Sequence, residues 1–154
     1  MNWTVLSFGR HKGKTLPQIV FADPDWFFWA WEENAYDSHG LKAEATRINK
    51  RARKIRIPKD GNVVRDAEYI IHPSTKNVTD VDFAPKSQPH TQGAGGTIRK
   101  SVIDLSVARN VQNYDKKGGK LVLRAVTPVL FPGRKRLTKA LVESFFDDDS
   151  NFVL

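Results

Sequence analysis

The chain has 154 residues, of which 40% are hydrophobic, and its 25 Lys and Arg against 17 Asp and Glu give a formal net charge of +8. This length predicts one domain or two small ones. The lack of cysteine excludes disulfides, thiolate metal sites and cysteine nucleophiles. No apolar run is long enough to span a membrane, and the first residues lack a secretory-signal profile. We therefore expect a cytoplasmic protein with no cofactor, no bound metal and no membrane partner.

The alternation of apolar and polar residues over 3–8 predicts a short strand, which a basic, glycine-punctuated turn follows at residues 9–14. Gly9 and Gly13 permit a tight backbone path. The cationic or titratable side chains of the turn are Arg10, His11, Lys12 and Lys14. Such a turn offers N–H groups and positive charge to an anion, so nucleic acid is the first partner to consider, against a merely solvated hairpin.

A helix is predicted from Pro24 to about Tyr36, because Asp23 is a typical N-cap and proline suits the first helical position. Residues 26–31 hold five aromatics, which is more than one helical face can bury.

Most of this aromatic cluster is expected in the core, Trp29 included. Trp31 is expected to be the exposed ring, because Glu32 and Glu33 follow it directly. An exposed ring is available for base stacking or for contact with a protein.

The segment FGRHKGKTL…DPDWFFWAW, within residues 5–32, resembles the pattern FGK(Y/H)KGKxL…P.YL.WL. That pattern marks a small module at the C-terminus of bacterial exodeoxyribonuclease X-like proteins and in related bacterial and bacteriophage proteins. The positions that match it are Phe8, Gly9, Lys12, Gly13, Lys14, Leu16 and Trp29. Phe27 and Phe28 stand where the module usually has Tyr-Leu. In that family the module looks like a DNA-binding accessory to a separate nuclease domain. No acidic nuclease motif appears elsewhere in this chain, so the resemblance implies DNA binding and not cleavage.

A second helix is predicted over residues 41–55, where apolar residues recur at spacings of three and four. Its other faces are strongly basic and lack the glutamates that would form i,i+4 pairs. The candidate phosphate-binding residues on these faces are Lys42, Arg47, Lys50, Arg51, Arg53 and Lys54. The alternative is a solvated helix surface.

Residues 63–71 and 78–83 are predicted to form two strands of a hairpin. Residues 84–96 are rich in proline and glycine and are interpreted as a mobile loop or linker.

Residues 101–114 fit either a helix or a strand. After a turn at Gly118-Gly119, the alternation over 120–127 predicts a strand. A final helix is predicted to run to about Phe146 with Thr138 as its cap.

The tail, residues 147–154, reverses the sign of the charge with Asp147, Asp148 and Asp149. Its mixture of acids and terminal apolar residues is similar in composition to the partner-recruiting tips of bacterial single-stranded-DNA-binding proteins. It is interpreted either as a contact for a protein partner or as a fraying helix end. Placed near a basic surface, it would repel phosphate.

Together these elements predict an α+β fold. A strand, a turn and two helices form a basic and aromatic nucleic-acid-binding module at 1–59. A small, mainly antiparallel sheet and a C-terminal helix follow at 60–154, with one single domain as the alternative.

The leading functional prediction is a non-enzymatic nucleic-acid-binding protein of bacterial or bacteriophage type. DNA is favoured over RNA as the nucleic acid that it binds. A protein-interaction or inhibitor module using the aromatic helix is the alternative. The third prediction is a small magnesium-dependent nuclease, for which the carboxylate pair Asp80 and Asp82 is the candidate, against a solvated hairpin edge.

Overall fold

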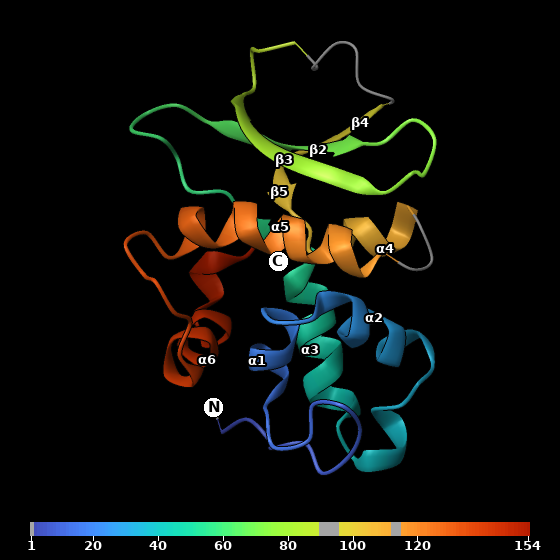
Figure 1. Ribbon diagram of the computed structural model, residues 1–154. Helices are drawn as coiled ribbons and strands as arrows, with labels where there is room; N and C mark the ends of the chain where they lie inside the picture. The colour runs from blue at the N-terminus through green and yellow to red at the C-terminus, as the bar shows by residue number, and fades with distance from the viewer. Residues whose placement is uncertain (1, 90–95, 112–114) are drawn as a thin grey trace.

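The structure is a computed structural model that describes residues 2–89, 96–111 and 115–154 (Figure 1). Its helices and its two small antiparallel sheets confirm the predicted α+β class. The larger sheet lies at one end of the molecule and the N-terminal helices lie at the other, with α5 (Lys116–Leu130) between them (Figure 1). Residues 90–95 of the predicted loop 84–96, and residues 112–114, lie outside the described residues.

The strand predicted at residues 3–8 is not formed. The backbone of Leu6 instead bonds to the turn that follows it: the N–H of Leu6 donates to Lys14 O, and the N–H of Gly13 donates to Leu6 O, both at 2.9 Å. These two bonds close the turn but build no ladder. A short helix that the sequence analysis missed follows as α1 (Leu16–Val20), and Thr15 and Gln18 form its capping box.

The aromatic helix begins as predicted at α2 (Pro24–Glu32), where the Asp23 carboxylate accepts from the N–H of Trp26. It ends four residues before the predicted Tyr36, because Asn34 adopts a left-handed conformation with φ of 56°. A 3-10 turn, η1 (Asp37–His39), then leads into α3 (Lys42–Ala52).

The hairpin is confirmed as β2 (Arg65–Ile71) and β3 (Val78–Pro85), which pair antiparallel. With β4 (Thr97–Lys100) they form a three-stranded sheet in the order β3-β2-β4. A second sheet joins β1 (Ile55–Arg56) to β5 (Val102–Ile103).

The strand predicted at 120–127 is wrong, because α5 covers that segment. Asp115 caps this helix by accepting from the N–H of Gly118 at 2.8 Å, so the two glycines lie in its first turn and not in a loop. The residues it buries follow a helical spacing: Gly118, Gly119, Val122, Leu123 and Val126. The strand pattern relied on Leu121, Leu123 and Ala125, and of these three only Leu123 is buried.

The ambiguous segment 101–114 contains β5 and then α4 (Val107–Val111). The C-terminal helix is confirmed as α6 (Lys139–Asp147), capped by Thr138, whose hydroxyl accepts from the N–H of Leu141. A 3-10 turn, η2 (Asp149–Asn151), follows it. Within the described residues, no helix combines the length and the apolar character needed to cross a bilayer.

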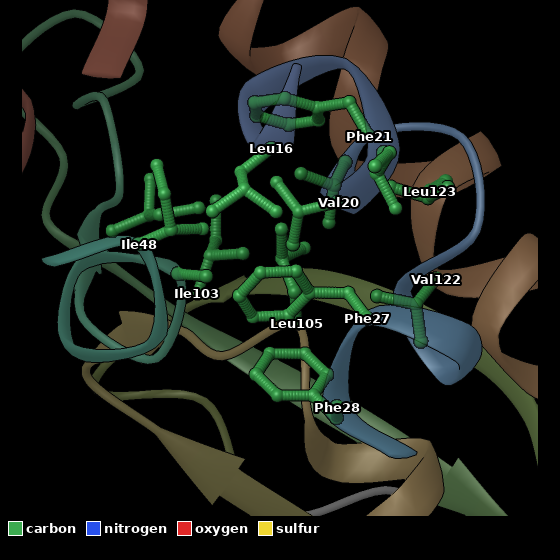
Figure 2. Close-up of a cluster of buried hydrophobic side chains, with 14 of the residues drawn as sticks. Leu16, Val20, Phe21, Phe27, Phe28, Ile48, Ile103, Leu105, Val122 and Leu123 are labelled. Atoms are coloured by element: carbon green, nitrogen blue, oxygen red, sulfur yellow. The ribbon is translucent and has the colours of Figure 1, made fainter. Parts of the chain in front are cut away.

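Buried side chains from both sides of residue 59 form one hydrophobic cluster (Figure 2). Leu16 of α1, Ile48 of α3 and Ile103 of β5 lie together in it, with Phe27 of α2 and Val122 of α5 nearby. This cluster fixes α2 against α5, and thereby sets the positions of the turn, the aromatic helix and the start of α5.

Candidate nucleic-acid interface

The basic turn is held by its own backbone. Gly9 and Gly13 have φ angles of +74° and +91°, in the region that favours glycine. The N–H groups of Lys12, Gly13 and Lys14 donate to backbone oxygens of the same segment. The N–H groups of these three residues are therefore already hydrogen-bonded within the turn. Only the charged side chains of the two lysines remain to contact a ligand.

The four basic side chains of the turn differ in their surroundings. Lys12 and Lys14 are exposed, and Arg10 is 59% exposed with Nη1 3.7 Å from Asp23 Oδ2. His11 is largely buried: its Nε2 lies 3.0 Å from Asp23 Oδ2, and its ring meets Trp26 edge-on at 5.0 Å. His11 therefore anchors the turn to the start of α2. The charged ends of Arg10, Lys12 and Lys14 are exposed to solvent.

The contact of Gly9 with Trp26 yields a stability prediction. A Cβ at Gly9 would lie 3.0 Å from Trp26 Cζ2, whereas a Cβ at Gly13 would meet nothing within 4 Å. Both glycines have positive φ, so each alanine carries a backbone cost of about 1–2 kcal/mol. We expect Gly9→Ala to lower the thermal midpoint by several degrees, and clearly more than Gly13→Ala. Equal midpoints in a calorimetric scan would mean that Trp26 does not constrain the turn.

A pocket of about 540 Å³ opens beside the turn. Its lining comes from the turn and the residue before it, from α2 and the segment that follows it, and from α4 and α5: Phe8, Gly9, Arg10, Asp25, Trp26, Trp29, Ala35, Arg109 and Lys116. Trp26 is 9% exposed and forms a wall, whereas Trp29 is 43% exposed. The structure thus joins the predicted turn and the predicted aromatic helix into one concave surface.

The exposed ring of α2 is Trp29, not the expected Trp31. Trp31 is partly buried against the core and does not line the pocket. Because Pro24, Trp26, Phe27, Phe28 and Ala30 are the buried residues of α2, position 29 is left on its outer side. The two glutamates after Trp31 indicated solvent near the helix end, but they carry no information about the rotation of the helix.

Arg109 lies at the edge of this pocket but is paired within the fold. Its guanidinium donates to both carboxylate oxygens of Glu32, at 3.0–3.1 Å, and to Asp25 Oδ1 at 3.1 Å. Partial desolvation disfavours its charge, but hydrogen bonds and attraction from the two carboxylates outweigh this and raise the pKa of Arg109. One guanidinium charge thus faces two carboxylate charges here. The other cations among the described lining residues are Arg10, which lies 3.7 Å from Asp23, and Lys116.

A smaller pocket of about 340 Å³ adjoins the first and shares Lys116 with it. It is lined by Asn77, Asp115, Lys116, Lys117 and Lys120. The Asp115 carboxylate is buried and accepts from Gly118 N, Asn77 Nδ2 and Val78 N. The lysines are what this pocket presents to solvent.

The predicted basic face of α3 divides into two sets. Its three arginines are packed within the fold: Arg47 lies over Trp3, Arg53 lies over Phe28 and bonds to Asn49 and Ser106, and Arg51 is buried. The lysines, Lys42, Lys50 and Lys54, are exposed, although Lys42 Nζ lies 3.8 Å from Asp37. The structure thus leaves lysines, and not the whole predicted set, available to phosphate.

The tail docks on the far end of α3. Arg51 donates to Asp149 Oδ1 at 2.7 Å and to Phe146 O at 3.3 Å. Ile55 and Phe152 form an isolated bridge, and the N–H of Val153 donates to Lys54 O. The tail therefore covers part of the predicted basic face with its own chain.

Over the described residues, no three His, Asp or Glu side chains gather as a metal site would require. Asp80 and Asp82 are exposed on β3, and His72 Nδ1 accepts from the N–H groups of Ser74 and Thr75 in the hairpin turn.

Sequence reasoning missed Lys116, Lys117 and Lys120 as site residues. The signal that could have found them is Asp115, an N-cap type of residue three positions before a glycine, followed by helically spaced apolar residues.

Comparisons with protein-family models, with curated proteins and with solved structures find no match for this chain.

Proposed function

We propose that this chain is a nucleic-acid-binding protein. The observation that carries the proposal is that Arg10, an exposed cation of the basic turn, lines an aromatic pocket, while the exposed Lys12 and Lys14 belong to the same turn. Gly9 and Arg10 belong to both the turn and the pocket, and Phe8, which directly precedes the turn, also lines the pocket. Cations bind phosphate oxygens and aromatic rings stack on bases, so this combination matches the two chemical parts of a nucleotide. DNA is the proposed partner in particular because residues 5–32 resemble a DNA-binding module.

A protein-binding role for α2 is the second candidate, and the exposure of Trp29 favours it. Aromatic residues are enriched in protein interfaces. A protein ligand on this surface has no general need for Arg10, Lys12 and Lys14, so the salt dependence of binding separates the two candidates.

The proposal predicts binding of labelled oligonucleotides with a steep dependence on salt. Fluorescence anisotropy at several salt concentrations should show the logarithm of the affinity falling linearly with the logarithm of the salt concentration. The slope should be roughly 0.7–0.9 per phosphate that the protein neutralises. Affinity that is independent of salt, or no binding at low salt, would contradict the proposed function.

A further inference from the structure

We propose that the 540 Å³ pocket takes one unpaired base of a single strand, which stacks on Trp29 while Arg10 and Lys116 hold the adjacent phosphates. This inference rests on the proposed function and specifies its substrate as single-stranded nucleic acid.

The size and lining of the pocket fit a base. Pockets for small-molecule ligands commonly measure about 300–1,000 Å³ and are lined mainly by apolar and aromatic side chains. Here Phe8, Trp26 and Trp29 supply the aromatic surface. The rings of Trp26 and Trp29 lie 6.3 Å apart at 52°, so the buried ring supports the exposed one. Trp29 is the one large exposed aromatic among the described residues, so its own chain leaves its ring available for stacking.

The charges around the pocket fit the phosphates on either side of a base. Asp25 is paired with Arg109, so this carboxylate does not stand alone against a phosphate. Arg10 comes from the turn and Lys116 from the first turn of α5, so cations from two different elements border the aromatic surface. A protein ligand would not require this placement of cations, whereas a strand that carries a phosphate beside each base does.

The second pocket continues the positive surface away from the base. Lys116 lines both pockets, and Lys117 and Lys120 follow it on the same helix. A strand whose base lies on Trp29 can therefore place its next phosphates along the first turns of α5. This contact surface lies outside the basic segments 9–14 and 42–54 on which the sequence prediction was centred.

The pocket also explains why a single strand should be preferred to a duplex. A base in a duplex is stacked and paired, so its entry into the pocket costs a few kcal/mol of unstacking. A single strand avoids this cost. A purely electrostatic surface would show the opposite preference, because a duplex carries more charge per unit length.

The test compares three DNA ligands on the full chain: a short strand, its perfectly paired duplex, and the same strand with abasic sites that keep every phosphate. We expect the strand to bind more tightly than the duplex, and abasic sites to weaken it about tenfold, the scale of one base–aromatic stack. Trp29→Ala should weaken the intact strand to a similar extent and leave the abasic strand almost unaffected. Trp29→Phe should keep most of the affinity, because it keeps a ring.

Each variant's thermal midpoint should stay near that of the parent protein, since position 29 lies outside the core cluster. Equal affinity for strand, duplex and abasic strand, with binding still dependent on salt, would overturn the base pocket and leave the proposed function standing. Absence of oligonucleotide binding at low salt would overturn both.

Discussion

Replacing Phe152 by Ala is expected to destabilise the fold by about 3–5 kcal/mol, the usual cost of removing a fully buried aromatic ring. Phe152 lies two residues before Leu154, the last residue of the sequence, yet it is only 2% exposed. Its ring stacks on Phe146 with centroids 5.5 Å apart and meets Phe145 edge-on at 5.3 Å. The guanidinium of Arg51 lies 5.0 Å over it. Its loss would leave a cavity and remove the main apolar contact that fixes the tail.

Urea unfolding followed by circular dichroism measures this change in the free energy of unfolding. Leu154→Ala is the matched control, because Leu154 lies at the same end and is 57% exposed. The control should stay within about 0.5 kcal/mol of the parent protein. If Phe152→Ala were as stable as the control, the tail would not be part of the fold in solution.

Because the tail is packed against α3, deleting it cannot isolate the effect of its aspartates on nucleic-acid affinity. Deleting residues 147–154 would remove Phe152 together with the aspartates, so any change in affinity would reflect damage to the fold as well as charge. Asp149 also accepts from the buried Arg51, and Asp148 caps η2. Asp148 and Asp149 thus have structural contacts, which their charge pattern alone did not indicate.

Elements with a local signal were predicted well. The Asp23-Pro24 pair placed the start of α2, and Thr138 placed the start of α6. The strands β2 and β3 were also located, because β-prone residues on either side of the turn residues at 72–77 are a local hairpin signal. Such signals depend on neighbours in the sequence and need no knowledge of the tertiary fold.

The errors share a physical cause in tertiary packing. The rotation of α2, which exposes Trp29, depends on which elements cover its other sides. Likewise, a basic helix has the same charge pattern whether a guanidinium faces water or, like Arg53, lies over Phe28. The first turn of α5 enters the site because helix and turn meet in space, although about a hundred residues separate Arg10 from Lys116. No short-range pattern records these contacts.

Replacing Arg10, Lys12 and Lys14 together by Ala is expected to weaken oligonucleotide binding about 100-fold at low salt. This assumes that each lost phosphate contact contributes about 1 kcal/mol. The slope of affinity against salt should fall by up to about three, one for each contact removed. The thermal midpoint should change little, because the two lysines are exposed, and Arg10, which lies 3.7 Å from Asp23, keeps 59% of its side chain exposed.

A control with the same change in net charge is available on the loop between α5 and α6. Arg134, Lys135 and Arg136 are all exposed there, and replacing them by Ala also removes three positive charges. If binding depends on the place of the charges, this control should retain most of the affinity. Equal losses in the two variants would mean that the protein attracts nucleic acid through its overall charge, without a site at the turn. A turn variant that binds normally but unfolds at a lower temperature would show that the turn is purely structural, and the resemblance to a DNA-binding module would then carry no functional meaning for this chain.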